Sequence, residues 1–466
     1  MILKLLKKKL YTLLSLIYSL MLTSTAIAQV TINLPESSIR TQSDYTAEAI
    51  GGPSLNGLLS LVPNINIKSN LANFPISSGA TSIPAVPLSR FFVKIYSIGT
   101  LILLGSSVEQ FPSNTEAKSI YGGLASVSPG PIKSNYRVQV GGYAWHAGTF
   151  SNTIVFSLAG LLGSIGTPNQ LINIVVPPFI TMETTSADIA LNVNTLDQFR
   201  STGVTANGNL NYFTTVNTNI RLKSTAANFS FNKTYPNLPV PVNVSTLLNV
   251  KIPTFTAVNP NTADQNVATN VVVPIGNKNL NAPAYTITAA NLKTNFIQAG
   301  IYTLPITYSI PPVTTNESTT ASVSGNATVN VASMSELIIS QPAVKLIFGS
   351  ANDYKNGVSV TMTNHLRVSS TVPYDITVKA SGATLTSTSG NTLPVNLIRI
   401  EGASGQSGIT PIILSATAQK LMNASAPAID RLLSIKYSIP SAQAAQLLNK
   451  AGGDYTTTVT YTIVAP

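Results

Sequence analysis

Strict alternation of apolar and polar residues marks the last segment of this sequence. Over Tyr455–Ile463 every second residue is aromatic, aliphatic or, once, threonine, and all the residues between them are threonines. A period of two places alternate side chains on opposite faces of a β-strand. The segment therefore predicts a strand with its aromatic face in a core and a threonine face in solvent.

The same alternation follows a glycine at three places along the chain. The glycines are Gly148, Gly300 and Gly453, which lie 152 and 153 residues apart. The aromatic positions of the three copies are, in chain order, Phe150 and Phe156, Tyr302 and Tyr308, and Tyr455 and Tyr461. A long, nearly constant period indicates one folding unit used repeatedly. We therefore interpret these nine residues as the structural core of a threefold repeat.

A second alternating segment recurs inside each unit, at residues 64–69, 219–224 and 375–380, and predicts a half-buried strand each time. Helical patterns are restricted to short pieces at 289–298 and 441–450, and Gly, Pro, Asn and Ser bound the other alternating stretches. Many short strands separated by such turns are typical of β-sandwiches. The predicted fold class is all-β, with three tandem immunoglobulin-like (Greek-key) β-sandwich domains after a cleaved signal peptide.

The first residues have the parts of a secretory signal. Four lysines lie before or at the start of an apolar run at Leu10–Leu22, and Ala26–Ala28 is an A-x-A cleavage site. The run is short for a membrane span, so we prefer a cleaved signal over residues 1–28 to an uncleaved anchor. The predicted domains then cover residues 29–160, 161–312 and 313–466, with no transmembrane segment in the mature chain.

Composition narrows the class of protein. Charged residues make up 9% of the chain, the hydrophobic fraction is 44%, and cysteine is absent. Without cysteine there are no disulfides, no lipobox and no thiolate metal ligands, so stability must come from the cores. Removal of the signal leaves 23 basic and 16 acidic residues, a net charge of +7. Because these charges form no basic run with interleaved aromatics, nucleic-acid binding is not expected. We interpret the charge as an aid to solubility, with adhesion to anionic surfaces as the alternative.

Residues with catalytic chemistry are scarce. The chain has two histidines, His146 and His365, and 16 acidic residues. The acids suggest no tuned acid/base pair, and no serine-hydrolase elbow, zinc-protease motif or phosphate-binding loop is present. We therefore predict a protein that is not an enzyme and that has no metal site and no cofactor.

Tyr143, Trp145 and His146 form the one candidate ligand-binding group. Aromatic faces suit the apolar faces of sugars, so these residues could hold a glycan. The alternative is that Trp145 is a core or loop-anchoring residue. His146 lacks a second histidine nearby, which disfavours zinc.

The Gly-x-Tyr segment has a second interpretation as a corner. An apolar residue followed by Gly-x-Tyr entering a strand is similar to the corner before strand F of immunoglobulin-like sandwiches, where a tyrosine hydroxyl bonds back to the loop. The first copy has Phe150 at this position and cannot form that bond. Gly-x-Tyr-Thr-x-x-Val-x-Tyr-x-Ile at 453–463 resembles the final strand of bacterial pilin-like and spore-coat-U-like sandwiches. The resemblance implies an immunoglobulin-type sandwich and a role in surface assembly, although many members carry cysteines and are single domains.

The last strand raises a question about the edge of the third sandwich. If the corner opens strand F, no residues follow Pro466 to form strand G. In pilin-like subunits a neighbour donates the missing strand by β-augmentation. The alternatives are that the N-terminal strand of the same domain takes this place, or that the sandwich needs no further strand.

These observations predict an exported, non-enzymatic structural or adhesive protein at the cell surface, secreted or periplasmic. Its expected partners are other surface or assembly proteins, including further copies of itself, joined through edge strands. The alternative function is a glycan- or ligand-binding module of a surface or periplasmic uptake system, with a glycan as the partner.

Overall fold

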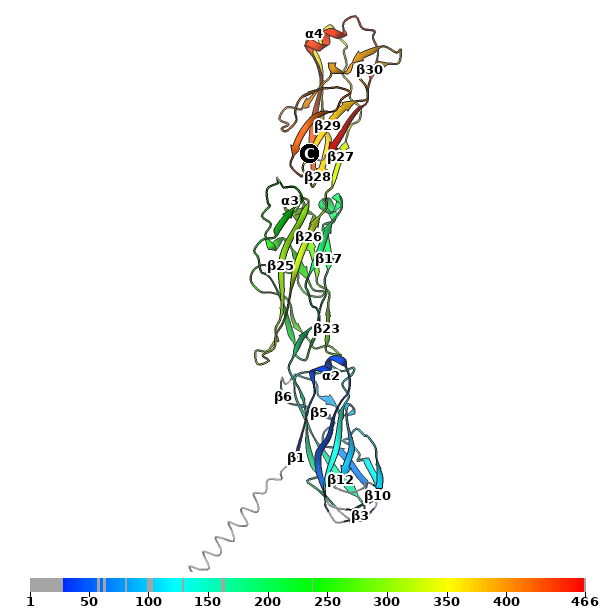
Figure 1. Ribbon diagram of the computed structural model, residues 1–466, viewed down its shortest axis with the longest axis vertical. Coiled ribbons are helices and arrows are strands. Elements are labelled where there is room, and N and C mark those ends of the chain that lie inside the picture. The colour runs from blue at the N-terminus through cyan, green and yellow to red at the C-terminus, as the bar shows by residue number, and fades with distance from the viewer. Residues whose placement is uncertain are drawn as a thin grey trace, which may run out of the picture.

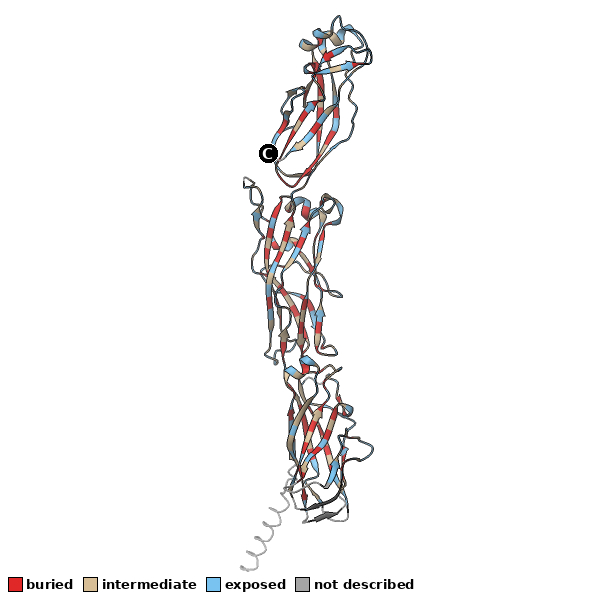
Figure 2. Ribbon diagram, turned by 45° about the vertical axis from the view of Figure 1, so that its right-hand side comes forward, coloured by how far each residue is buried: buried red, intermediate tan, exposed pale blue. Residues whose placement is uncertain are grey.

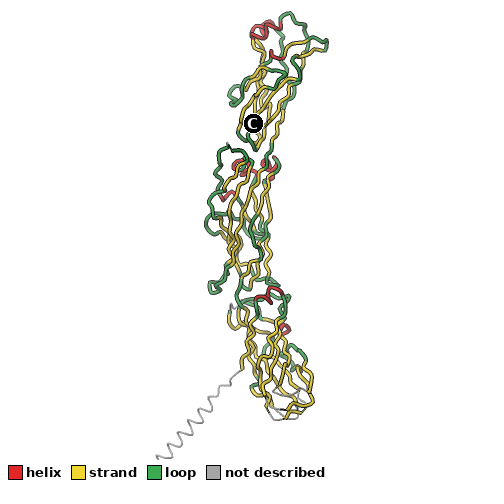
Figure 3. Tube along the Cα trace, viewed as in Figure 1, coloured by secondary structure: helices red, strands yellow, loops and turns green. Residues whose placement is uncertain are grey.

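The computed structural model describes residues 28–464, apart from 57–58, 62–63, 80–81, 99–103, 128–129, 161–163 and 237. The predicted signal segment lies outside the described residues, except for Ala28. The described chain is elongated, with three lobes that follow one another end to end (Figure 1). Strands and loops make up nearly all of it (Figure 3). The predicted all-β class is confirmed.

Strand pairing groups the elements into three sets, which we call the first, second and third unit. The first unit contains β1 Ala28–Asn33, α2 Glu36–Thr41, β2 Tyr45–Asn56, β3 Leu59–Leu61, β4 Asn64–Ser69, β5 Asn73–Phe74, β6 Ile76–Ser78, β7 Val86–Pro87, η1 Leu88–Arg90, β8 Phe91–Ile98, β9 Leu104–Ser107, β10 Lys118–Val127, β11 Gly130–Val138, β12 Gly148–Ala159, β13 Ser164–Gly166 and β14 Asn169–Val176.

The second unit contains β15 Ile180–Met182, β16 Ile189–Val193, η2 Gln198–Thr202, β17 Val204–Asn207, β18 Leu210–Thr214, β19 Thr218–Ser224, β20 Ser230–Lys233, η3 Ser245–Leu247, β21 Asn249–Lys251, β22 Gln265–Val271, β23 Lys278–Asn281, β24 Ala284–Ile287, α3 Ala289–Asn295, β25 Gly300–Ile310 and β26 Ala321–Val331. The third unit contains β27 Ser335–Ile339, α4 Ala351–Asn356, β28 Gly357–Ser370, β29 Tyr374–Ala380, β30 Thr384–Ser387, β31 Thr392–Pro394, η4 Val395–Leu397, β32 Arg399–Gly402, β33 Ile412–Ile413, β34 Gln419–Ser425, β35 Ala428–Pro440, α5 Ser441–Ala444, η5 Ala445–Leu447, β36 Tyr455–Thr456 and β37 Val459–Val464.

Each unit surrounds its own apolar core, and buried residues recur along the strands of every lobe (Figure 2). The main sheet of the first unit has the order β1-β14-β12-β4-β10-β3 and faces the sheet β13-β2-β11-β8. The second unit is built around β16-β26-β25-β19-β22, and the third around β27-β28-β35-β32-β33 and β34-β29-β37. The separate cores are consistent with three tandem domains, which remain a prediction.

Two strands lie beyond the domain boundaries expected from the sequence. β14, which follows residue 160, pairs with β12 and with β1 of the first unit. β26, which follows residue 312, likewise pairs with β25 and β16. We therefore place the divisions between units after Val176 and Val331, because backbone pairing, not the end of the repeated segment, decides which unit a strand completes.

The corner glycines have backbone angles that suit glycine alone. Gly148, Gly300 and Gly453 have φ of 143°, 149° and 136°. A Cβ on Gly300 would lie 2.5 Å from the backbone oxygen of Asn232. The Tyr302 hydroxyl donates to the Gln298 carbonyl over 3.0 Å, and the Tyr455 hydroxyl bonds the Ala451 carbonyl in the same way over 2.8 Å. Both are the corner hydrogen bonds that the sequence predicts.

A second tyrosine of the repeat forms a bond between the two layers of its unit. In the second unit the Tyr308 hydroxyl lies 2.7 Å from that of Tyr285, and Tyr461 and Tyr437 form the same pair in the third. The first unit has Tyr136 at the position of Tyr285, and among the described residues its buried hydroxyl forms no hydrogen bond of normal geometry, with the buried Ser134 hydroxyl nearby. The reason is that Phe156 occupies the place of Tyr308 and carries no hydroxyl.

Phe156→Tyr is therefore expected to stabilise the first unit by about 1 kcal/mol, because it supplies the missing partner of a buried hydroxyl. Calorimetric unfolding of the full chain measures the gain. The same substitution in a Tyr136→Phe background is the matched control, since the added hydroxyl then has no buried hydroxyl of Tyr136 to pair with. An equal gain in both variants would contradict the pairing.

Candidate functional site

The edge of the third unit differs from the corresponding edges of the first two. β12 lies between β14 and β4, and β25 lies between β26 and β19. β37 is the strand at the same position of the repeat. Within the described residues it pairs with β29 alone, so no strand is hydrogen-bonded to its other side; β27 approaches it without pairing.

The burial of the repeated side chains follows this difference. In β25 the inward side chains are nearly inaccessible, with Ile306 1% and Ile310 0% exposed. The corresponding Val459 and Ile463 of β37 are only half-buried. The strand itself is also interrupted: β25 is continuous, whereas its counterpart is divided into β36 and β37. A missing neighbour explains both effects, because an edge strand loses cover on one flank and half of its backbone hydrogen bonds.

A second unpaired segment lies at residues 343–348. In the first two units the corresponding segments, β1 and β16, run parallel to β14 and β26. In the third unit Val344, Leu346 and Phe348 pack against the core in the same alternating way, yet the segment has no strand partner among the described residues. Its Ile347 side chain is 72% exposed.

Residues 343–348 and β37 therefore correspond to the two segments that flank β14 in the first unit and β26 in the second, and we call this part of the third unit the open edge. A strand in this position would run antiparallel to β37 and parallel to residues 343–348, as β14 and β26 do in their units. It would satisfy backbone N–H and C=O groups on both sides and would cover the half-buried Val459 and Ile463.

A buried polar chain lies behind the open edge. The Tyr437 hydroxyl contacts both the Tyr461 hydroxyl of β37 and, at 2.8 Å, Nε2 of His365 on β28. His365 is 2% exposed, and its Nδ1 has no hydrogen-bond partner among the described residues. Burial lowers the pKa of His365 and raises that of Tyr437 to about 12. The imidazole is therefore held neutral in the folded protein, because a second ring proton would place an unpaired charge in the core.

The third unit is consequently expected to lose stability in acid. Unfolding returns His365 to its usual pKa of about 6.5, so below that pH the unfolded chain binds more protons than the folded one. The stabilising contribution is complete above about pH 6.5 and declines as the pH falls toward the lower folded pKa. Thermal unfolding between pH 8 and pH 5 measures this contribution of His365 to the stability of the third unit. His365→Gln should reduce the change of unfolding temperature with pH for the third unit, and His146→Gln should not. If wild type and His365→Gln show the same change with pH, His365 is not the group responsible.

The predicted ligand-binding residues lie elsewhere, where the first unit meets the second. Trp145 is 0% exposed, and its indole N–H donates to the Val140 carbonyl over 2.9 Å. The Tyr143 ring packs edge-on against the Trp145 ring, with the ring centres 5.0 Å apart. The Arg90 guanidinium lies over the Tyr143 ring, 4.8 Å from its centre. Sugar stacking needs an exposed ring face, so this geometry fits the alternative interpretation, in which Trp145 anchors a loop. His146 is half-buried, and burial lowers its pKa.

Reasoning from the sequence missed the segment at 343–348. Its signal is the alternation of Val344, Leu346 and Phe348, which has the period of a strand. The same alternation occurs at Val30 and Ile32 in β1 and at Leu191 and Val193 in β16. Among the described residues no helix is long and apolar enough to cross a membrane, and no three potential metal-ligating side chains lie together.

No protein-family model matches this sequence, and no similar curated protein was found. Solved structures with fold similarity include CfaE, the adhesive subunit of the CFA/I fimbria of enterotoxigenic Escherichia coli. It is 11% identical, with a TM-score of 0.30 over 65% of this chain and 98% of that chain. The tip adhesion subunit CsuE of the archaic chaperone-usher Csu pili of Acinetobacter baumannii, in complex with CsuC, is 14% identical, with a TM-score of 0.30 over 61% and 99%. The CupB6 tip adhesin from Pseudomonas aeruginosa is 10% identical, with a TM-score of 0.25 over 61% and 93%.

Proposed function

We propose that this protein is an exported structural or adhesive surface component that assembles by accepting an extended strand at the open edge. The observation that carries the proposal is that, among the described residues, β37 is hydrogen-bonded to a strand on one side only, whereas β12 and β25 are paired on both sides. Strand addition of this kind supplies affinity through main-chain hydrogen bonds and specificity through alternate side chains.

The first two units supply the template for such a strand. In β26 the inward side chains include Ala327, Val329 and Val331, each at most 5% exposed. In β14 they include Ile172 and Ile174, both fully buried. The incoming strand should therefore carry small or β-branched apolar residues at alternate positions. The alternative, a glycan-binding module that uses Tyr143, Trp145 and His146, lacks an exposed ring of Trp145 to support it.

A synthetic peptide with the sequence of Ala321–Val331 tests the proposal on the full chain. We expect the peptide to raise the unfolding temperature of the third unit and to slow hydrogen exchange of the β37 amides. At a peptide concentration near 100 times Kd, the gain is about 2.7 kcal/mol.

A peptide of the same length with Val329→Asp is the matched control, because it places a charge on the inward face of the strand. It should leave both the unfolding temperature and the exchange rates unchanged. Unaltered β37 exchange at saturating concentrations of the unmodified peptide would contradict the proposal.

A further inference from the structure

The two junctions between units repeat one hydrogen-bonding pattern. The Ala147 N–H, just before the first corner glycine, donates to the Thr215 carbonyl of the second unit over 2.8 Å. The Ala299 N–H, just before the second corner glycine, donates to the Thr371 carbonyl of the third unit, also over 2.8 Å. In both junctions, therefore, the residue before the corner glycine of one unit forms a hydrogen bond with the next unit.

The two threonines also hold the segment that connects the units. The Thr215 hydroxyl donates to the Pro177 carbonyl over 2.8 Å and accepts from the Phe179 N–H. The Thr371 hydroxyl donates to the Ala332 carbonyl over 2.8 Å and accepts from the Met334 N–H. These connectors directly follow β14 and β26, so the strand that completes one unit leads straight into the next unit.

In each junction, a basic side chain on a short helix of one unit contacts the next unit. We call the end of each unit that bears this helix its helix end; it carries α2 in the first unit, η2 and α3 in the second and α4 in the third (Figure 1). Arg40, in the last turn of α2, lies with its guanidinium 5.5 Å from the centre of the Phe213 ring in the second unit. Arg200, in the last turn of η2, lies 2.9 Å from both Glu336 and Asp430 of the third unit.

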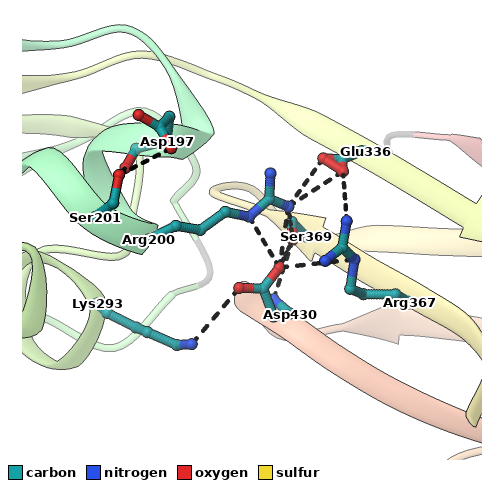
Figure 4. Close-up of polar contacts among 8 residues, drawn as sticks. All are labelled: Asp197, Arg200, Ser201, Lys293, Glu336, Arg367, Ser369 and Asp430. Carbon is teal, nitrogen blue, oxygen red and sulfur yellow. Dashed lines mark hydrogen bonds and ion pairs between the residues drawn. The ribbon is translucent and has the colours of Figure 1, made fainter.

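The second junction is complementary in charge (Figure 4). The helix end of the second unit supplies two cations, Arg200 and Lys293, and Lys293 Nζ lies 3.6 Å from Asp430. The third unit supplies the carboxylates of Glu336 and Asp430. Burial acts to raise the pKa of Asp430, but hydrogen bonding and the charges of Arg200 and Lys293 outweigh it, so the pKa lies below its usual value. The carboxylate is therefore ionised and paired across the junction.

The helix end of the third unit also has a basic side chain on a short helix and an N–H group before the corner glycine. In the described part of the chain no further unit packs against this end. Lys355 lies in the last turn of α4, is exposed, and has no ion pair among the described residues. Gly452 precedes the third corner glycine, as Ala147 and Ala299 precede the first two, and its N–H has no backbone acceptor in the described part of the chain. This end lies at the far tip of the elongated chain, away from the other two units (Figure 1).

We infer that the α4 end of the third unit is a docking surface for a β-sandwich unit of a partner subunit, which follows the strand added at the open edge. This inference rests on the proposed function. A strand that runs antiparallel to β37 leaves the open edge at the α4 end, as β26 leaves the second unit beside Arg200. The unit that follows it presents a carboxylate to Lys355 and a backbone carbonyl to the Gly452 N–H.

Charge favours a different protein over a second copy of this chain as the partner. The free end of the first unit, which carries β3 and β10, would be the end to meet α4 of another copy (Figure 1). The residues that adjoin β3 at that end, 124–134, contain Lys133 and no acid, whereas Lys118 begins β10 at its other end and lies 3.7 Å from Glu116. This end therefore offers Lys355 no carboxylate, whereas the end of the third unit presents two, Glu336 and Asp430, beside the single guanidinium of Arg367.

A tandem protein tests the docking surface with a known partner end. Residues 311–466 are repeated after Pro466 of the full chain, so that a second β26 can fill the open edge and a second Asp430 can reach Lys355. A zero-length carbodiimide joins lysine amines to adjacent carboxylates, and mass spectrometry of the monomer fraction identifies the pairs. We expect a link from Lys355 to the added Asp430 or Glu336, at a yield similar to that of Lys293 with the native Asp430.

Two controls separate docking from strand addition. Lys345 is exposed on the same unit and should remain unlinked. Val329→Asp in the added segment should abolish both the Lys355 link and the protection of β37 from hydrogen exchange. Protection of β37 without a Lys355 link would overturn the docking surface and leave the proposed function standing. Loss of both in the unmodified tandem would overturn the proposed function and the docking surface with it.

Discussion

Replacing Trp145 by alanine is expected to lower the free energy of unfolding of the first unit by about 4 kcal/mol. The side chain is fully buried, and its removal leaves a cavity beside Tyr143 and an unpaired Val140 carbonyl. Truncation of a buried aromatic side chain costs both its transfer free energy and the cavity that remains. Calorimetric unfolding of the full chain measures the loss in the transition of the first unit.

Two conservative variants divide this effect into its parts. Trp145→Phe retains most of the ring and removes the 2.9 Å bond to Val140, so a smaller loss of about 1–2 kcal/mol is expected. Tyr143→Phe removes the 3.2 Å bond to the Ala85 carbonyl and should cost about 1 kcal/mol. A variant Trp145→Ala that kept wild-type stability but lost saturable sugar binding would reverse the interpretation and favour the glycan-binding module.

Asn277→Ala is expected to weaken the junction of the first and second units by about 4 kcal/mol. The buried amide donates to the carbonyls of Trp145 and Thr214, both over 2.7 Å, and accepts from the Trp145 N–H over 3.0 Å. Alanine leaves all three backbone groups buried without this partner. It also loses the tolerance of asparagine for a positive φ, here 60°. Calorimetry should show the first two transitions moving apart, because the bonds that couple the units are lost.

Asn279→Ala is the matched control for this junction. Asn279 lies two residues further along the same segment, is 8% exposed, and its amide nitrogen has no partner among the described residues. Its replacement should cost less than about 1 kcal/mol, since no hydrogen bond of that amino group is broken. Equal losses in the two variants would show that the amide contacts of Asn277 do not hold the junction.

The local features of the fold could be predicted from the sequence. The period-two segments at 64–69, 219–224 and 375–380 form β4, β19 and β29, with Ile65, Ile220 and Ile376 fully buried. The corner bond of Tyr302 spans four residues, so the atoms that form it are adjacent in the chain. Alternation and short-range hydrogen bonds depend on neighbouring residues, and a sequence displays these directly.

The position of Trp145 could not be predicted in the same way. An aromatic residue beside a tyrosine and a histidine has the composition of a sugar site, and only its surroundings distinguish a site from a core. Those surroundings include Asn277, 132 residues away, whose amide bonds both the N–H and the C=O of Trp145. Because such contacts depend on how units meet, no local pattern around residue 145 reports them.

The sequence by itself determined that this chain is built from strands and which face of each repeated strand is buried, and it predicted that one unit recurs three times. The tertiary structure decided which strand completes which unit. β14 and β26 close the first and second units, while in the described part of the third no corresponding strand pairs with β37 or with residues 343–348. The physical reason is that side-chain alternation selects the buried face of a strand, whereas its edges are satisfied by backbone groups, which are the same in every residue but proline.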